Sequence, residues 1–496
     1  GDDNCRSGPA FNKDWAPAFA WLQGGQAIVD GRVQSGDRPE AVKSMRRLRE
    51  KWLHSAHLVG RAARHYERAS QLLDAAAAAV AAPLVPGSPL SDGMARAPVG
   101  LWVQALAPAR VDLAGGWSDT PPLTYEAPPM IDTPLVRRWR PPSTPCVDPA
   151  PPLPGARARR TPEPTIVIRT LNTKWGEEDS GFVSEVVVPA VEDLLDFNQP
   201  GAQGALVKSA LICLGLVAVP LDTPSATVTL ADQLMMTVGG GLEVETFSSL
   251  PQGSGMGTSS ILASCVIGSI MEVAGLRYDR QSVVHLVLML EQMLTTGGGW
   301  QDQVGGMYGG IKASMCPAKL PLAVNMTPLH STEAELAKQA AFWASSAFLV
   351  YTGETRLAKY LLQRVLRQWA LRDAKLVSVV DGLRTNAVAV AQAVVNCDAA
   401  GMGYGLAQYW AQKKKMAPGA EPPAIANLIA AIDEHCWGCS LTGAGGGGFL
   451  IGVAKSPEAL DAIRGVLGTR PEFEGCTMHE AALDADGMVV SLCAEK

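Results

Sequence analysis

The segment Leu250–Ser260, LPQGSGMGTSS, carries alternating glycines followed by three hydroxyl residues in a row. Glycine has no Cβ atom, so the backbone N–H groups of such a segment can approach a bulky anion closely. The apolar run ILASCVIGSIM comes next, and it predicts a helix from Thr258 to about Ala274 that ends at Gly275. Because the first N–H groups of a helix are free and its dipole is positive there, the segment predicts a phosphate-binding loop.

The length, charge and cysteine content of the chain limit the classes of protein that fit it. Its 496 residues exceed what one hydrophobic core usually serves, so we expect two or three domains. The net charge of −6 gives no general attraction to nucleic acid or to an anionic membrane, and no apolar run is long enough to span a bilayer. The ten cysteines follow no disulfide framework, which favours the cytoplasm.

Two small groups of possible metal ligands stand out. Cys436 and Cys439 have CxxC spacing without a second pair, which favours two buried thiols and leaves a zinc or redox site as the alternative. His54 and His57 share a helix face among basic residues, which favours a solvated surface. The chain begins at Gly1 without a signal-like segment, and we expect it to be a fragment of a longer protein.

The composition divides the chain into three regions. Residues 1–97 combine helical periodicity with a Pro/Gly-rich linker, which predicts the helical tail of an upstream region. Residues 98–320 and 321–496 mix strand and helix patterns, which predicts an α+β fold of two packed subdomains. Twelve prolines fall between 127 and 164, and we predict that this insert forms neither a core strand nor a core helix.

Common phosphate-binding motifs do not fit the sequence. A Walker A loop ends in Gly-Lys-Ser/Thr, and the chain contains no Gly-Lys dipeptide. GAGGGG at Gly443–Gly448 satisfies G-x-G-x-x-G, but FLIGVA follows it as a predicted strand, whereas a dinucleotide-binding fingerprint opens a helix. The glycine loop, lysine and HRD set of the protein kinases is missing as well.

Four segments together resemble the GHMP kinases, the family that includes galactokinase and the homoserine, mevalonate and phosphomevalonate kinases. In chain order they are APARVDLAGGWSDTPP, LPQGSGMGTSS, TTGGGWQDQVGG and LTGAGGGGFL. Their sequences are most similar to the kinase half of the L-fucokinases, with the heptose kinases next. The resemblance covers roughly 100–126 and 165–496. It implies the two-subdomain GHMP-kinase fold, with a glycine-rich phosphate loop opening a helix, and ATP and Mg²⁺ as cofactors.

The resemblance assigns the nucleotide site to the glycine loop. It implies that the following residues bind ATP: Pro251, Gly253, Ser254, Gly255, Met256, Gly257, Thr258, Ser259 and Ser260. It implies Ser259 and Glu291 as Mg²⁺ ligands, the latter because it lies eleven residues before Asp302. Glu291 also stands among apolar residues, where an unpaired carboxylate is costly to bury, so a cation is expected nearby. A surface position on an amphipathic helix is the alternative.

The resemblance also implies a catalytic pair and a sugar site. Asp302 is expected to orient or accept the proton of the substrate hydroxyl, with Arg110 beside it. Asp119 is expected to bind ring hydroxyls, since a carboxylate accepts hydrogen bonds from two of them at once. Trp117 is expected either to stack on an apolar face of the sugar or to belong to the core. A turn packed against the phosphate end of the site is expected from Gly443, Ala444, Gly445, Gly446 and Gly447.

The function implied by the resemblance is ATP-dependent phosphorylation of the anomeric hydroxyl of L-fucose, which gives fucose 1-phosphate. A sugar 1-kinase of heptose or galactose type is one alternative. A catalytically silent ATP- or sugar-binding protein is another, because the proline-rich stretch 127–164 replaces or interrupts a strand that lines the pocket in the family. The expected partners are therefore a small sugar and ATP.

Overall fold

The computed structural model describes most of the chain from residue 95 onward. The described ranges are 95–121, 123–126, 130–136, 154–172, 181–199, 201–219, 228–251, 253–294, 298–316, 324–354, 359–370, 373–479 and 482–493. The helical tail predicted over 1–97 lies almost wholly outside them, as do His54 and His57 and a large part of the proline-rich insert.

A six-stranded sheet forms the first part of the molecule, with the strand order β14-β1-β4-β7-β5-β6. Its strands are β1 (Trp102–Leu106), β4 (Gly155–Thr161), β5 (Ile166–Asn172), β6 (Gly181–Val188), β7 (Gly241–Ser248) and β14 (Val489–Cys493). All neighbours pair antiparallel except β5 and β7, which pair in parallel. The helices of this part are α4 (Ala205–Cys213), α5 (Leu230–Thr237), α6 (Thr258–Ala274), α7 (Arg280–Met293) and α8 (Gln301–Met307).

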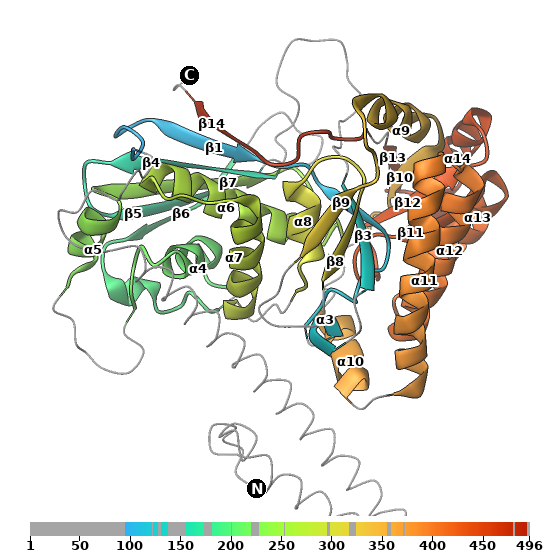
Figure 1. Ribbon diagram of the computed structural model, residues 1–496, viewed down its shortest axis with the longest axis horizontal. Coiled ribbons are helices and arrows are strands. Elements are labelled where there is room, and N and C mark those ends of the chain that lie inside the picture. The colour runs from blue at the N-terminus through green and yellow to red at the C-terminus, as the bar shows by residue number, and fades with distance from the viewer. Residues whose placement is uncertain are drawn as a thin grey trace, which may run out of the picture.

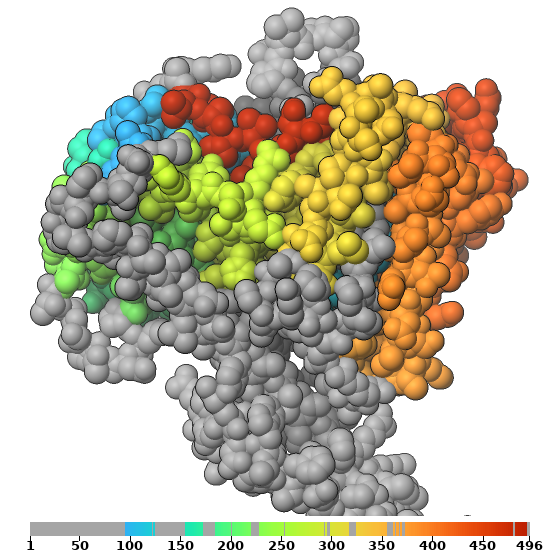
Figure 2. Space-filling view, in the orientation of Figure 1, coloured from blue at the N-terminus to red at the C-terminus, as the bar shows by residue number. Residues whose placement is uncertain are grey.

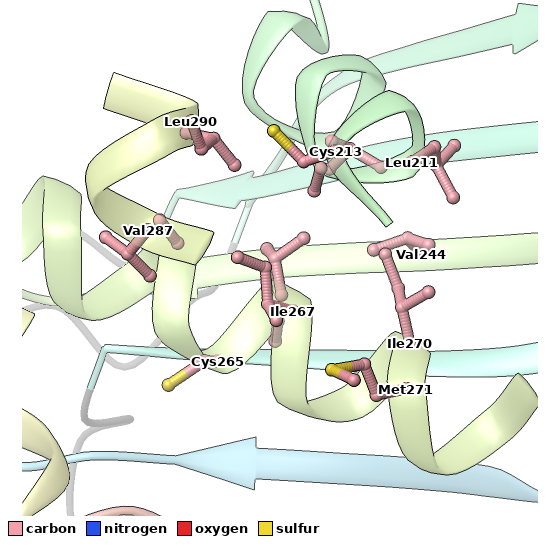
Figure 3. Close-up of a cluster of buried hydrophobic side chains, with 14 of the residues drawn as sticks. Leu211, Cys213, Val244, Cys265, Ile267, Ile270, Met271, Val287 and Leu290 are labelled. Atoms are coloured by element: carbon pink, nitrogen blue, oxygen red, sulfur yellow. The ribbon is translucent and has the colours of Figure 1, made fainter. Parts of the chain in front are cut away.

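One face of this sheet is apolar and the other is charged. Along β4, Ala156 and Ala158 belong to the hydrophobic core, whereas Arg159 on the opposite face donates from Nε to Glu243 Oε2 at 2.7 Å. Figure 3 shows the apolar side, where α4, α6 and α7 bring together Cys213, Ile267 and Leu290. An antiparallel sheet with one face in the core has this alternation.

The helix after the phosphate loop has the predicted bounds. α6 runs from Thr258 to Ala274, and Gly275 follows it with a left-handed φ of 69°. α7 begins at Arg280, and Asp279 Oδ1 accepts a hydrogen bond from Ser282 N at 2.7 Å, which is the predicted cap. These ends were predictable because the capping residues determine them locally.

The prediction that 127–164 contains no core strand is wrong. β4 lies inside the six-stranded sheet, and β3 (Met130–Val136) lies between β2 (Arg110–Ala114) and β8 (Lys312–Cys316) in a second sheet, completed by β9 (Asn325–Pro328). GARARRT in β4 alternates small apolar and charged residues without a proline, a strand pattern concealed by the prolines around it. Pro134 of β3 stands opposite Asp112, where the register with β2 shifts, and such irregularities tolerate proline.

A third sheet and a layer of helices form the second part of the molecule. The strand order is β11-β12-β10-β13, with β10 (Ala347–Tyr351), β11 (Cys436–Leu441), β12 (Phe449–Ala454) and β13 (Thr477–His479). The helices are α9 (Glu333–Ser346), α10 (Lys359–Ala370), α11 (Ala374–Asn396), α12 (Ala399–Met416), α13 (Pro423–Ile432) and α14 (Pro457–Thr469). Figure 1 shows α11 and α12 as a long pair at one end of the molecule. The helical stretch predicted over about 357–412 is therefore three helices.

Short helical turns complete the described elements. They are α3 (Leu123–Glu126), η1 (Val191–Leu194), η2 (Asp433–His435) and η3 (Pro471–Phe473). Among the described residues, no helix combines the length and apolar character that crossing a bilayer requires.

The C-terminal strand returns to the first part of the molecule. β14 pairs antiparallel with β1, from Trp102 opposite Cys493 to Leu106 opposite Val489. In Figures 1 and 2 this red C-terminal segment runs beside the blue N-terminal strand, at the end of the molecule far from α11 and α12. The predicted boundary near residue 320 stays a prediction, and the last strand of the chain lies in the sheet of the region before that boundary.

Candidate active site

The glycine-rich loop connects β7 to the first turn of α6. Gly253, Gly255 and Gly257 adopt left-handed φ values of 76°, 73° and 71°. L-amino acids with a Cβ atom rarely adopt this conformation, so every second position of the loop favours glycine. Between them, the side chain of Met256 is buried in the core. The alternation seen in the sequence therefore has a backbone cause, and it produces the kind of turn that binds anions through N–H groups.

The predicted nucleotide-binding residues differ in their access to solvent. Ser254 and Ser260 are buried, Thr258 is half-buried, and Ser259 is exposed. The hydroxyls of Ser254 and Thr258 lie 3.2 Å apart. The face of this first helical turn that reaches solvent therefore carries Ser259, whereas Ser260 points into the protein.

The second glycine-rich segment packs directly against the phosphate loop. Thr442 Oγ1 donates to Ser254 O at 3.2 Å, and Phe449 N donates to the same oxygen at 3.1 Å. A Cβ atom on Gly448 would lie 2.4 Å from Ser254 O, and one on Gly255 would lie 2.6 Å from Thr442 O. The two turns approach backbone to backbone, so each constrains the position of the other.

Arg110 and Asp302 meet although 192 residues separate them. Arg110 Nε donates to Asp302 Oδ1 at 2.7 Å, and NH2 of the same guanidinium donates to the same oxygen. The arginine side chain is 2% exposed and the aspartate 29%, so the carboxylate faces solvent above a buried guanidinium. Burial acts to lower the pKa of Arg110, but the charges of Asp302 and Asp112 outweigh it and raise that pKa above its ordinary value.

The phosphate loop touches this pair. A Cβ atom on Gly257 would lie 3.0 Å from Arg110 Cγ and 3.1 Å from Asp302 Cβ, and Arg110 N donates to Met256 O at 3.2 Å. Asp302 lies in the first turn of α8. Gly305 of that helix is needed because a Cβ atom there would lie 2.7 Å from Arg110 Cβ. Close glycine contacts thus bring three distant motifs to one point.

Asp119 is buried beside this pair. Its Oδ2 accepts from Gln301 N at 3.2 Å, and its Oδ1 has no hydrogen-bond partner among the described residues. Gly299 allows this approach, since a Cβ atom there would lie 1.8 Å from Asp119 Oδ2. Burial, reinforced by the negative charge of Asp302, raises the pKa of Asp119 to about 7. The carboxyl group therefore has an unfilled acceptor close to Asp302.

Glu291 on α7 is buried, which excludes the alternative of a surface glutamate. It accepts a hydrogen bond from Ser260 Oγ, so the structure joins Glu291 to Ser260, while Ser259 is exposed on the same helical turn. Burial raises the pKa of Glu291 to about 8; the hydrogen bond from Ser260 opposes this shift and the charges of Asp302 and Asp119 add to it. Three carboxyl groups are thus near enough to influence one another.

These oxygen donors fit a hydrated magnesium ion better than a fully protein-bound metal. Among the described residues, no group of three or more His, Cys, Asp or Glu side chains is placed to hold a metal. Mg²⁺ bound with ATP needs only one or two carboxylates, because water and phosphate oxygens complete its octahedron. Glu291, the serine hydroxyls and Asp302 are oxygen donors of the kind it takes, and positive charge would favour the ionised form of the buried Glu291.

Trp117 belongs to the core. Its side chain is 6% exposed and packs in the hydrophobic cluster that includes Phe348 and Trp369. Its φ of 80° is an uncommon conformation for a bulky residue. The turn that carries Asp119 is therefore attached to the second part of the molecule by a buried tryptophan.

Two family patterns match the chain. The pattern of the GHMP kinases N terminal domain matches residues 225–310, which include the phosphate loop, Glu291 and Asp302. The pattern of the GHMP kinases C terminal region matches residues 391–470, which include the second glycine-rich segment. The chain carries both GHMP kinase domains. The predicted α+β GHMP-kinase fold is thereby confirmed.

Curated proteins similar to this chain include two fucose enzymes that each carry two activities in their names. An L-fucokinase/L-fucose-1-P guanylyltransferase of Bacteroides fragilis is 32% identical over 78% of this chain and 38% of its own length. A bifunctional fucokinase/GDP-fucose pyrophosphorylase of Arabidopsis thaliana is 30% identical over 74% of this chain and 31% of its own length. The chain thus spans about a third of the length of these two relatives.

Solved structures share the fold at lower sequence identity. A D-glycero-D-manno-heptose 1-phosphate kinase from Bacteriodes thetaiotaomicron aligns with a TM-score of 0.51 and 16% identity, over 79% of this chain and all of its own. This likeness supports the fold of the GHMP kinase domains.

Sequence reasoning missed one group of buried residues behind Arg110. Asp112, two residues further along β2, contacts Tyr409 and Lys413 of α12. The signal available for Asp112 in the sequence was an acidic residue between the apolar residues Val111 and Leu113. Lys413 gave no such signal, because it opens the run KKK at the end of a helix, a pattern typical of a solvated surface.

Cys436 and Cys439 are both buried, as the sequence favoured. They belong to β11, and neither forms a disulfide. Their side chains lie in the core cluster of the second part of the molecule.

Proposed function

We propose that this chain is an ATP-dependent sugar kinase that phosphorylates the anomeric hydroxyl of L-fucose. One observation carries the proposal: Arg110 and Asp302 form a pair that opens to solvent through Asp302, and a Cβ atom on Gly257 of the phosphate loop would lie within 3.1 Å of both. A kinase must hold the terminal phosphate of ATP beside the acceptor hydroxyl, since phosphoryl transfer depends mainly on alignment and on neutralised charge. The choice of fucose rests on the two fucokinase relatives.

Each part of the site then has a chemical task. Backbone N–H groups of the phosphate loop bind the phosphates of ATP, and the first turn of α6 adds the positive end of its dipole. Asp302 orients the sugar hydroxyl and takes its proton as the P–O bond to the sugar forms and the bond from the terminal phosphorus to ADP breaks, with ADP leaving. Arg110 holds Asp302 and favours the negative charge that develops on the reacting oxygens. When bound, Mg²⁺ would be held by Glu291 and a serine hydroxyl, and it would neutralise phosphate charge.

Asp119 is proposed to bind the sugar. Its Oδ1 lacks a partner among the described residues and lies near Asp302, so a ring hydroxyl can supply the missing hydrogen bond. Leaving a buried acceptor unpaired is costly, and this favours a ligand that donates to it. Trp117 supports the turn from the core and is not proposed to stack on the sugar.

A panel of free sugars tests the substrate. The protein is incubated with Mg²⁺–ATP and L-fucose, D-galactose or a D-manno-heptose, and both ADP and the sugar phosphate are measured. We expect a kcat/KM for L-fucose at least about 10-fold above that for the other sugars. Turnover of the heptose or of galactose without fucose would transfer the proposal to the alternative sugar 1-kinases.

A catalytically silent ATP- or sugar-binding protein is the remaining alternative. It predicts thermal stabilisation by ATP without ADP release on any sugar of the panel. Its motivation was the proline-rich stretch after Glu126, which replaces or interrupts a strand of the family, and β3 and β4 weaken it because two strands are present in that region.

A further inference from the structure

A buried carboxylate stands behind the catalytic pair. The side chain of Asp112 is 1% exposed, and its two oxygens receive four hydrogen bonds. Oδ1 accepts from Arg110 NH1 at 2.8 Å and from Gly443 N at 2.9 Å. Oδ2 accepts from Tyr409 Oη at 2.7 Å and from Lys413 Nζ at 2.9 Å. The carboxylate is thus saturated by four donors from three segments of the chain, namely β2, α12 and the second glycine-rich segment.

The charges of this cluster alternate. Lys413, Asp112, Arg110 and Asp302 follow one another as plus, minus, plus and minus, and only Asp302 reaches solvent. Lys413 is fully buried and also donates to Leu441 O at 2.8 Å. The charges of Lys413 and Arg110 outweigh burial and lower the pKa of Asp112 below its ordinary value.

Asp112 occupies one side of the Arg110 guanidinium. NH1 is used by Asp112, which leaves Nε and NH2 for Asp302. A guanidinium held at one end by a fixed carboxylate cannot rotate away from the other without losing a charged hydrogen bond. The hydrogen bond from Arg110 NH1 to Asp112 therefore fixes the orientation of the guanidinium toward Asp302.

Asp112 also reaches the phosphate loop through Gly443. A Cβ atom on Gly443 would lie 2.8 Å from Gly255 Cα, so the peptide held by Asp112 is in direct contact with the loop. Tyr409 extends the contact to the sugar turn, because a Cβ atom on Gly116 would lie 2.2 Å from its hydroxyl. The Asp112 carboxylate is therefore hydrogen-bonded to three groups around the site: Gly443 N, which packs against the phosphate loop, the Arg110 guanidinium, and Tyr409, which packs against the turn that carries Asp119.

We propose that Asp112, fixed by Tyr409 and Lys413, is a positioning residue that keeps Arg110 aligned on Asp302 and the phosphate loop in register with that pair. This inference rests on the proposed kinase function. Stability alone explains such a cluster poorly, because well-packed apolar residues often stabilise a protein as well as a buried ion pair does. A positioning role predicts effects on turnover and on ATP affinity that melting temperature alone does not explain.

The first variant is Asp112→Asn. All four neighbours of the carboxylate donate hydrogen bonds, so the amide NH₂ must face either Arg110 and Gly443 or Tyr409 and Lys413, whichever way it turns. We expect kcat to fall by roughly 10²-fold, which is the scale of a lost charged interaction at a catalytic group. The KM for the sugar should stay within about 3-fold, because Asp119 and Asp302 remain. The Kd for ATP should rise by about 3- to 10-fold.

The second variant is Lys413→Met, which keeps the length of the side chain and removes its charge. Asp112 then keeps a negative charge that only Arg110 balances, so the guanidinium should be drawn away from Asp302 and kcat should fall by about 10-fold. Lys414→Met is the matched control. Lys414 is the next residue of α12 and 40% exposed, and it pairs with Glu421 at 3.1 Å, so kcat and ATP affinity should not change.

The double variant Asp112→Asn/Lys413→Met provides the decisive comparison. Without the Lys413 donor, the amide can turn its NH₂ toward Tyr409 and its oxygen toward Arg110, so kcat should recover by about 5-fold or more relative to Asp112→Asn. Multiplicative losses, with no recovery, would contradict the shared role. The single variants could instead have lower melting temperatures while kcat and ATP affinity stay within about 2-fold of wild type. The cluster would then contribute to stability only, and the positioning role would be wrong.

The order of the measurements distinguishes a failure of the proposed kinase function from a failure of the inference about Asp112. Wild-type turnover is measured first on the sugar panel, and absence of any sugar phosphate rejects the kinase proposal. The ATP titrations then decide the inference by themselves: weaker binding in Asp112→Asn with recovery in the double variant supports it, and unchanged affinity overturns it. A wild-type protein that binds no ATP overturns both.

Discussion

The two sides of the candidate site are built from different materials. The phosphate side consists of backbone, with Gly255 and Gly257 in one turn and Gly443 and Gly448 in the turn packed against it. The acceptor side consists of buried carboxyl groups, where Asp119 and Glu291 have pKa values raised to about 7 and about 8. The first side depends on the absence of side-chain atoms, and the second depends on charge. The glycine turns should therefore be sensitive to an added methyl group. The buried carboxyl groups should be sensitive to pH and to replacement by a neutral isostere.

The largest effect is expected where the two sides meet, at Asp302. Asp302→Asn keeps the shape of the side chain but removes the carboxylate that we propose as the proton acceptor, so kcat should fall by roughly 10³-fold, within the range for general-base catalysis. ATP should still bind, because the loop backbone is unchanged. Steady-state kinetics with a parallel ATP titration measures both quantities.

Asp461→Asn is the control for this variant, since Asp461 is 78% exposed on α14 and its substitution should leave kcat unaltered. Turnover by Asp302→Asn at a near-normal rate would remove Asp302 from the chemistry. Loss of ATP binding together with turnover would mean that the two sides of the site are not independent.

A single methyl group should break the phosphate side. Gly257→Ala places a Cβ atom at a left-handed φ of 71° and within 3.1 Å of both Arg110 and Asp302. We expect kcat/KM for ATP to fall by about 10²-fold, because the loop or the pair must shift and small misalignments are costly in phosphoryl transfer. The decrease should be the same at pH 6 and pH 8 if geometry alone is responsible.

Gly465→Ala provides the matched control for this substitution. Nothing lies within 4 Å of the added atom in helix α14, so it should stabilise the protein slightly, by about 0.5–1 kcal/mol, and leave activity unchanged. Equal activity of the two alanine variants would show that the loop tolerates side-chain atoms and is not a close-fitting phosphate site.

The same contrast explains what the sequence could and could not predict. The glycine turn before α6, the helix itself and the cap at Gly275 were predictable because glycine and capping signals act over a few residues. The pairing of Arg110 with Asp302 was inferred only through the family resemblance. Lys413 was missed because its partner, Asp112, lies 301 residues away, and no local pattern distinguishes a buried lysine from a solvated one. β4 was missed because prolines that flank a strand dominate the composition of the region without entering it.

The smallest effect is expected from pH on the acceptor side, measured as stability without ligand. Burial raises the pKa of Asp119 from 3.8 to about 7, so between these values the folded protein holds a proton that the unfolded chain has lost. The free energy of unfolding must then decrease as pH rises through this window. Asp119→Asn mimics the protonated form at every pH and should lack this component, so its stability relative to wild type should increase by on the order of 2 kcal/mol between pH 5 and pH 8.

The comparison with Asp119→Asn isolates one group, because Glu291 and Lys312 are present in both proteins. Lys312 acts in the opposite direction, since burial lowers its pKa and its contribution to stability increases with pH. Urea unfolding at four pH values, in the presence of a chelator and with Asp461→Asn as the exposed control, measures the difference. Parallel stability curves for wild type and Asp119→Asn would mean that Asp119 is ionised in the folded protein at neutral pH. The acceptor side would then resemble the phosphate side in depending on shape more than on charge.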